Sequence, residues 1–173
     1  MTNKCINNAC VSNVSADFTK CTALGANGMC SEGVCQRLVA IRSAIMENAV
    51  TPYIQASTTN PQLQARGANI GPFETFLECS GLGGVAFRSY ETKRFIAVHA
   101  DGYVHADGGS TLLTATKFTV IGSNIRTTDG SGAYLQCSPL TFPEAGRLQK
   151  QVMPASPGFW ENLPIEAGTW TTP

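Results

Sequence analysis

The sequence predicts an all-β fold made of three repeats of four short strands each, preceded by a separate cysteine-rich segment. Three stretches of the chain align with one another at a period of about 40 residues, which indicates one structural unit used repeatedly. Each stretch holds four short apolar patches separated by turn residues, and such patches are typical of strands. No unit of this kind buries its apolar face alone, so the three repeats are expected to form one domain.

The expected strands occupy equivalent positions in repeats that span about residues 38–80, 84–121 and 123–167. In chain order they are 39–43, 53–55, 63–65 and 73–76, then 85–89, 95–97, 104–106 and 118–120, and finally 124–127, 134–136, 148–150 and 160–163. The stretch 38–55 alone has apolar residues at helical spacing. Its counterparts in the other repeats are strand-like and lie beside glycine, so a hairpin with a longer loop is predicted. The repeats make up a body of residues 37–168, followed by a tail of residues 169–173.

The first 36 residues are expected to form an irregular arm held together by disulfides. They contain five of the seven cysteines, namely Cys5, Cys10, Cys21, Cys30 and Cys35. A segment so poor in large apolar residues needs a covalent staple or a surface to lie on. A metal site is the rival interpretation, but its usual Cys-x-x-Cys spacing is absent, and unpaired thiols in a reducing compartment are the third. Because seven is odd, at least one thiol stays unpaired or bonds to another chain.

Asp101-Gly102 separates two apolar patches and is a strong signal for a two-strand hairpin. The two histidines of the chain, His99 and His105, flank this turn, so we expect them to come close together, near Asp101 and Asp107. Two imidazoles and a carboxylate can bind a transition metal or transfer protons. Exposed hairpin residues without a ligand are the commoner outcome. We therefore expect no metal and no cofactor, with His99 and His105 as the weak metal candidates.

Several motifs in the repeats resemble the fascin-like β-trefoil family. They are Arg42-Ser43 and Arg88-Ser89, Asp101-Gly102-x-Val104-x-Ala106-Asp107, and the run from Ile70 to Phe76. This chain has Phe73 where the family usually has Trp, and its third copy, Trp160 to Leu163, is degraded. The resemblance covers about residues 38–167 and implies a β-trefoil with pseudo-threefold symmetry. The family includes actin-bundling proteins and carbohydrate-binding modules, and bundling is not expected from a single trefoil.

The repeats also predict which side chains form the core. Residues expected to point inward are Ile41, Phe87 and Ile125, with Tyr53, Phe95 and Tyr134 stacked around the threefold axis against Phe76, Phe118 and Leu163. Cys137 aligns with Ala56 and Val98, which predicts a small buried residue. The arginines Arg42, Arg88 and Arg126 should point outward and make structural hydrogen bonds or ion pairs, either with several carbonyls or with a carboxylate such as Glu74 or Glu161.

Composition and motifs argue for binding and against catalysis. Lys and Arg together number 12, as do Asp and Glu, so the formal net charge is zero, which disfavours a nucleic-acid partner. No apolar run approaches the roughly 18 residues of a membrane span, so no membrane insertion is expected. The chain lacks a Gly-x-Ser-x-Gly element and a phosphate-binding glycine loop, so it is not expected to be an enzyme.

The leading functional hypothesis is a non-catalytic recognition module at an exposed surface, with glycans as the leading ligand class. Sugar sites combine an exposed aromatic platform with a few polar groups. The candidate ligand-binding residues are Tyr90, Asp101, Tyr103, Asp107 and Trp170, and Asn124, Gln149 and Gln151 could add polar contacts. The Gln-x-Trp repeat of ricin-type lectins is absent. The competing interpretation of the aromatics is that they cap the barrel or contact the arm.

The alternative is a structural or decoration subunit of a virus particle, filament or cell surface. Its partner would be another protein subunit or a second copy of the chain, with the arm as the anchor and the trefoil displayed. Low charge and a cysteine-rich arm suit such a role. Although the first residues lack the apolar core of a signal peptide, an extracellular, cell-surface or virion-surface location is favoured over the cytoplasm.

Overall fold

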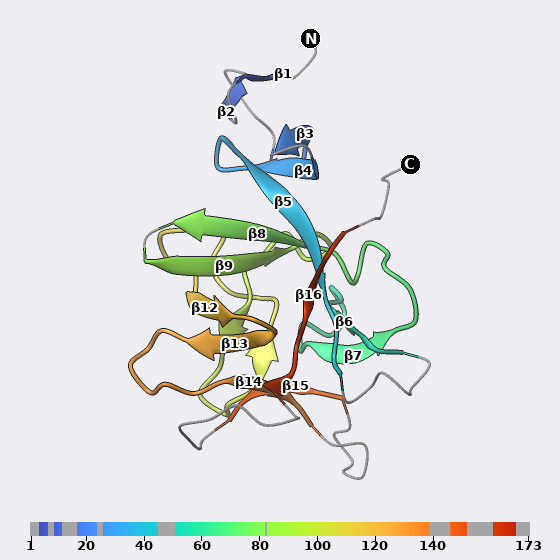
Figure 1. Ribbon diagram of the computed structural model, residues 1–173, viewed down its shortest axis with the longest axis vertical. Helices are drawn as coiled ribbons and strands as arrows, with labels where there is room; N and C mark the ends of the chain where they lie inside the picture. The colour runs from blue at the N-terminus through green and yellow to red at the C-terminus, as the bar shows by residue number, and fades with distance from the viewer. Residues whose placement is uncertain are drawn as a thin grey trace.

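The computed structural model describes residues 4–6, 9–11, 17–23, 26–44, 51–81, 83–138, 146–151 and 161–168. These residues form antiparallel β-strands joined by turns, without an α-helix among them, which confirms the all-β prediction (Figure 1). No helix that could cross a membrane occurs in this part of the chain. The strands are β1 (Lys4–Ile6), β2 (Ala9–Val11), β3 (Lys20–Ala23), β4 (Ala26–Ser31), β5 (Val34–Ile41), β6 (Tyr53–Gln55), β7 (Gln64–Gly67), β8 (Phe76–Gly81), β9 (Gly84–Ser89), β10 (Ala97–Val98), β11 (Val104–His105), β12 (Phe118–Ile121), β13 (Asn124–Thr127), β14 (Leu135–Cys137), β15 (Leu148–Lys150) and β16 (Ile165–Ala167).

The largest sheet forms a curved wall. Its strands β5, β8, β9, β12 and β13 are hydrogen-bonded in that order, and β16 pairs with β5 at the other side. Two further hydrogen bonds connect the ends of this row: the Leu163 amide donates to the Ser123 carbonyl at 2.7 Å, and the Asn124 side-chain amide donates to the Glu161 carbonyl at 2.8 Å. The wall therefore bends back on itself and encloses a core.

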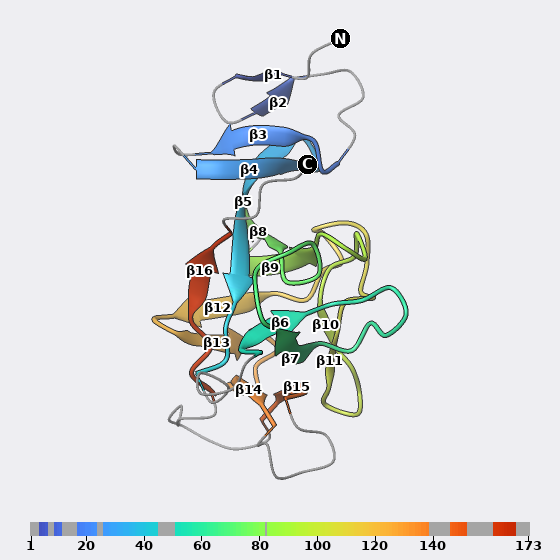
Figure 2. The ribbon, with the colours of Figure 1, turned by 90° about the vertical axis from the view of Figure 1, so that its right-hand side faces the viewer.

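Three two-stranded hairpins, β6–β7, β10–β11 and β14–β15, lie beside this wall (Figure 2). Each hairpin touches the other two through one isolated β-bridge, and these bridges are Gln62 with His105, Gln64 with Arg147, and Tyr103 with Gln149. The three hairpins are therefore joined in a ring, one hairpin from each sequence repeat.

The repeats predicted from the sequence recur as equivalent backbone contacts. In each repeat the arginine forms an isolated bridge with an aromatic residue, and these pairs are Arg42 with Tyr53, Arg88 with Phe95, and Arg126 with Tyr134. The next residue along the chain closes the same turn in every repeat, with an amide hydrogen bond of 2.8 or 2.9 Å. The sequence alignment therefore corresponds to a structural equivalence.

The core contains most of the residues expected there. Ile41, Phe87 and Ile125 are fully buried, as are Phe76, Phe118 and Leu163, and Cys137 is a buried thiol, as predicted. The prediction for the second patch of each repeat was wrong by one residue: the main core holds Ile54, Ile96 and Leu135, the residues after the three aromatics. Bridged residues on neighbouring strands share one face of a sheet. Because each aromatic is bridged to an arginine rather than to a core residue, it lies off the main core.

The arginines make the expected kinds of contact, with carboxylates and with carbonyls. Arg88 is buried, which corrects the expectation that it points outward. Its guanidinium donates to Asp17 at 2.6 Å and to the Ser31 hydroxyl at 2.9 Å. Arg42 pairs with Glu166 at 3.4 Å. Arg126 donates to a backbone carbonyl, that of Gly132, at 3.3 Å.

Glu74 does not take the partner expected for it. Its carboxylate accepts the Gly71 amide at 3.0 Å, within its own turn, instead of an arginine. The side chain is only 6% exposed, and burial raises its pKa. Glu74 is therefore a desolvated carboxyl held by a backbone donor.

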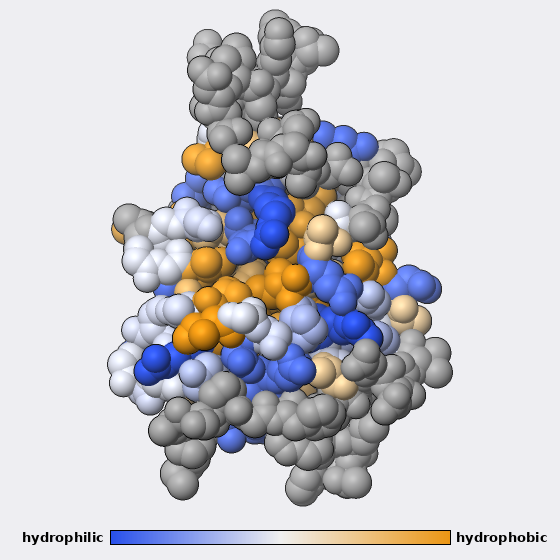
Figure 3. Space-filling model, viewed as in Figure 1, coloured by the Kyte–Doolittle hydropathy of each residue, from blue (hydrophilic) through white to orange (hydrophobic). Residues whose placement is uncertain are grey.

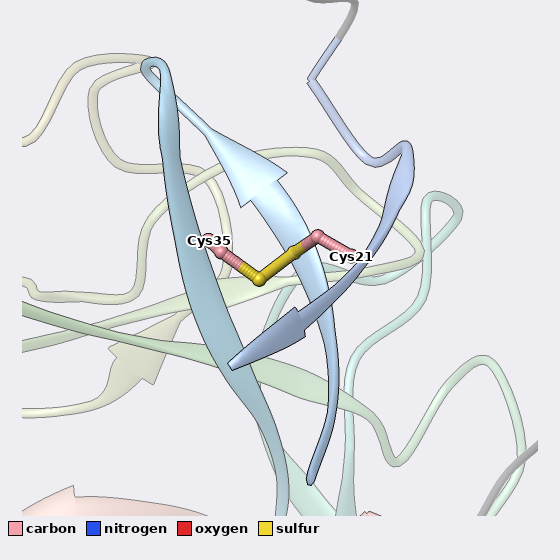
Figure 4. Close-up of a disulfide and its surroundings, with 2 residues drawn as sticks. All are labelled: Cys21 and Cys35. Atoms are coloured by element: carbon pink, nitrogen blue, oxygen red, sulfur yellow. A yellow bond between two sulfur atoms is a disulfide. The ribbon is translucent and has the colours of Figure 1, made fainter. Parts of the chain in front are cut away.

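The N-terminal segment is not irregular as expected, because it forms strands β1–β4 and continues directly into the wall through β5; it is stapled by disulfides, as predicted. Cys21 on β3 is bonded to Cys35 on β5 with Cα atoms 5.9 Å apart (Figure 4), and Cys30 is also disulfide-bonded. Cys5 and Cys10 face each other in the β1–β2 register, and their side chains lie outside the described residues. Strand β5 pairs with β4 in its first half and with β8 in its second, so it crosses the expected boundary at residues 36 and 37.

A second apolar cluster holds this segment against the wall. It brings Met29 and Leu38 together with Leu77, Cys79 and Phe95. Burial raises the pKa of the Cys79 thiol to about 12. Both Cys79 and Cys137 are therefore protonated packing residues rather than nucleophiles.

Candidate functional site

A groove of about 930 Å³ opens beside the second hairpin. One wall is the β10–β11 turn, through Val98, His99, Ala100 and Gly102. A second wall is formed by residues 126–133, from the end of β13 into the β13–β14 loop, and the remaining lining comes from residues 115–117 before β12 and residues 150–151 at the end of β15. Segments from the second and third repeats therefore meet in one concave surface.

The groove carries more positive than negative charge. Its lining includes Lys117, Arg126 and Lys150 but a single carboxylate, Asp129. Lys150 donates to Asp129 at 2.5 Å, and this hydrogen bond is the main reason that the pKa of Asp129 lies well below its usual range. Since Asp129 is ionised, it neutralises Lys150, and Lys117 and Arg126 remain as an excess of two cations.

The two remaining cations are held by carbonyl groups. Lys117 donates to the Leu112 carbonyl and, at 3.0 Å, to the Ala115 carbonyl. Burial lowers the pKa of Lys117. Arg126 is exposed and contacts the Gly132 carbonyl through its Nε. Because Arg126 lines the groove, its two terminal amino groups can offer donors to a molecule bound there.

Gln151 lines the same groove and has an unused acceptor beneath its surface. Its Oε1 is buried and has no hydrogen-bond partner among the described residues. Its backbone is fixed, because the Gln151 amide donates to the Tyr134 carbonyl at 2.8 Å. A buried acceptor left unpaired costs about 1–3 kcal/mol, so a ligand hydroxyl that reaches this oxygen would regain that free energy.

Three of the residues predicted to bind a ligand, Asp101, Tyr103 and Asp107, belong to the hairpin that forms one wall of the groove but do not line the groove. Asp101 is exposed and caps its own turn, since its carboxylate accepts the Tyr103 amide at 3.0 Å. The Tyr103 ring lies 5.6 Å from the guanidinium of Arg147. Asp107 binds His99. Of the polar residues expected to help, Gln151 does line the groove.

Tyr90 lies elsewhere, against the N-terminal segment. Its ring packs edge-to-face on Phe18 with centroids 5.7 Å apart, and the Lys93 ammonium lies 3.6 Å from its centroid. This contact matches the competing interpretation of the aromatics as contacts for the arm. Trp170 falls outside the described residues.

The two histidines meet across their hairpin, as predicted. Ala97 pairs with His105, Val98 pairs with Val104, and Gly102 takes the left-handed conformation (φ 86°) that the turn requires. The imidazole rings stack with centroids 4.0 Å apart and an interplanar angle of 14°. The His99 Nε2 lies 2.8 Å from Asp107 Oδ1. Burial, and then the neighbouring His99, lower the pKa of His105.

Sequence reasoning missed the cationic side of the groove. Arg126 was expected to be structural because it aligns with Arg42 and Arg88, and Lys117 had no signal of its own. The run Asp129-Gly130-Ser131-Gly132 did signal a hairpin turn, without indicating that the turn would form a groove wall. No protein-family model matches the chain, and no curated protein matches it.

Proposed function

We propose that this chain is a single β-trefoil of the fascin-like type that acts as a carbohydrate-binding module, with the groove beside β10–β11 as its binding site. The fold part of the proposal is supported by three equivalent arginine–aromatic bridges and by three hairpins that contact one another in a ring. The disulfides of the N-terminal segment suit an oxidising, exported setting.

One observation carries the functional part: a concave surface in which a buried, unpaired acceptor adjoins several donors. Sugars present hydroxyls that both donate and accept, and sites for them place a few polar groups at fixed positions. Gln151 Oε1 is such an acceptor, and Arg126 supplies donors. Both are fixed by strands or by a backbone contact, so little ordering is needed on binding.

The charge of the groove selects among saccharides. Two cations in excess of carboxylates favour a ligand with its own carboxylate or sulfate. The planar guanidinium of Arg126 can hold such a group through two parallel hydrogen bonds. The described lining contains no Phe, Tyr or Trp, so recognition would rest on hydrogen bonds and charge rather than on stacking. We therefore expect acidic glycans to be preferred over neutral ones.

Calorimetric titration with lactose and sialyllactose, a neutral and acidic matched pair, and with a heparin-derived tetrasaccharide tests this proposal. The wild-type chain should bind an acidic probe and not lactose. Arg126→Ala should weaken that binding about tenfold or more, through the loss of a charge-assisted contact. Arg66→Ala, an exposed arginine of β7 outside the groove, is the matched control and should leave binding unchanged. Equal affinity of all three proteins for the acidic probe would refute the groove as the site.

A structural or decoration subunit remains the second candidate because of one surface feature. Apolar residues gather over β12, β13 and β16 on the face shown in Figure 3. Ile121 of β12 is 46% exposed, and Val120 of β12 and Ile165 of β16 are partly buried. Strands β1–β4 also extend beyond the wall (Figures 1 and 2). If this face is an assembly contact, the wild-type chain forms a discrete oligomer on sizing and Ile121→Lys dissociates it.

A further inference from the structure

The side chains of His99, His105 and Asp107 gather at the open side of the second hairpin. One ligand atom from each lies within 4.8 Å of the other two. Two imidazole nitrogens and one carboxylate oxygen form a donor set that Zn²⁺ takes in proteins. We propose that these three residues form a site for a transition-metal ion of the Zn²⁺ type.

The three ligand atoms lie near enough to one another to reach one ion after the side chains reorient. Metal–ligand bonds of about 2.0–2.2 Å in a tetrahedral arrangement place neighbouring ligand atoms about 3.4 Å apart. His99 Nε2 and Asp107 Oδ1, at 2.8 Å, are already nearer than this. The His99 and Asp107 side chains are each 39% exposed, so they can turn without repacking the core. The two imidazoles must leave their parallel stack before both nitrogens face one ion, because their lone pairs lie in the ring planes.

Backbone hydrogen bonds and bridges fix the main-chain positions of His99 and His105. The His99 amide donates to the Tyr103 carbonyl at 2.9 Å, and the Gly102 amide donates to the His99 carbonyl at 2.9 Å. On the other strand, His105 pairs with Ala97 and forms a bridge with Gln62 of the first hairpin. The main chain of both histidines is therefore fixed before any ion binds, which lowers the entropy lost on binding.

An independent observation points to a ligand on His105. Its Nε2 is buried and has no hydrogen-bond partner within the described part of the chain. Native structures rarely leave a buried polar atom without a partner, and a metal ion is one of the partners that satisfies such an atom. The stacked His99 ring cannot be the hydrogen-bond partner of this nitrogen, because a stacked ring presents its face rather than a donor or an acceptor.

The site differs from a closed structural zinc site. Three protein ligands leave a fourth position for solvent or for an oxygen of a bound molecule. His99 also lines the groove, so an ion at this site would lie at the groove's edge. The proposal does not depend on saccharide binding, since the three ligands belong to the hairpin alone.

The test is a calorimetric and thermal-melting titration of the tag-free chain with Zn²⁺. The expected result is one ion per chain with a higher Tm, because an ion that binds the folded state stabilises it. Asp107→Asn and His105→Ala should each weaken binding about tenfold or more. Asp101→Asn removes the same charge from the same hairpin without removing a ligand, and it should bind as the wild type does. If His105→Ala fails to fold, His99→Ala, at an exposed position, takes its place.

A cobalt spectrum separates this site from the cysteines. Co²⁺ bound here should show ligand-field bands without thiolate charge transfer, and those bands should vanish in Asp107→Asn. Absence of stoichiometric binding overturns the proposal. Undiminished binding in both ligand variants, or a thiolate signature in the cobalt spectrum, also overturns it.

Discussion

The buried guanidinium of Arg88 lies 2.6 Å from the carboxylate of Asp17, and this ion pair connects the wall to the N-terminal segment. The Asp17 carboxylate also accepts the Glu32 amide at 2.9 Å. The Asp17 side chain therefore contacts both the turn between β4 and β5 and Arg88 of the wall. Phe18 adds its ring, which lies 4.8 Å from the Arg88 guanidinium. The segment is therefore a packed part of the described structure.

Removing this carboxylate should destabilise the fold. Asp17→Ala leaves Arg88, whose side chain is 6% exposed, as a buried charge without its counter-ion. Loss of one partner of a fully buried pair costs about 3–5 kcal/mol, and because Asp17 is itself 32% exposed we expect about 1–3 kcal/mol. Urea unfolding measures the change. The control is Arg37→Ala, which breaks a half-exposed pair with Glu78 and should cost less than about 1 kcal/mol.

The Cys21–Cys35 disulfide should contribute to stability through the loop it closes. The two cysteines are 14 residues apart, and closing such a loop is worth about 3 kcal/mol. Replacing both by serine should lower the free energy of unfolding by about 2–4 kcal/mol and lower Tm. Melting in the presence and absence of reductant gives a second readout. An unchanged Tm in both experiments would show that the Cys21–Cys35 disulfide does not stabilise the folded chain.

Glu74 should make stability depend on pH in an unusual direction. Burial raises its pKa in the folded chain, so the folded state binds a proton more tightly than the unfolded state does. Stability from this group is then greatest at acidic pH and falls as pH rises through the unfolded and then the folded pKa. Glu74→Gln keeps an acceptor for the Gly71 amide and removes the charge.

The glutamine variant should therefore be more stable than the wild type near pH 8, and the difference should shrink toward pH 4. Thermal melting at both values measures this. Glu91→Gln, at a partly exposed turn position, is the control and should show no such trend. A difference for Glu74→Gln that is constant with pH would mean that the carboxyl is not desolvated.

Sequence patterns predicted the repeat more reliably than they predicted which side chains of each strand point into the core. Alignment of the three stretches identified which turns and hairpins are equivalent, because equivalent units share turn residues and apolar spacing. The alignment predicted that the Tyr53 side chain points into the core, whereas in the structure the side chain of the next residue, Ile54, is the buried one. Side chains alternate across a strand, so an offset of one residue exchanges the two faces, and adjacent apolar residues such as these leave the facing undecided.

The cysteine segment and the groove show the other limit. Five clustered cysteines predicted disulfides, but the pairing of Cys21 with Cys35 depends on the order in which β3, β4 and β5 lie side by side. Gln151 and Arg126 meet in one groove because both pair with Tyr134, Arg126 through a β-bridge and Gln151 through its amide. The local sequence around each residue carries no information on this pairing, so Gln151 was proposed only as a polar contact and Arg126 was not proposed.

The measurement that tests the central claim most directly is a ¹⁵N–¹H NMR titration of the wild-type chain with sialyllactose and the heparin-derived tetrasaccharide, with lactose as the neutral control. The account predicts that an acidic probe shifts amides of residues 98–102, 115–117, 126–133 and 150–151, while lactose shifts none of them. Amides of β6 and β7, in the first hairpin, should stay in place. Shifts concentrated outside the groove, or no shifts with either acidic probe, would contradict the proposed site.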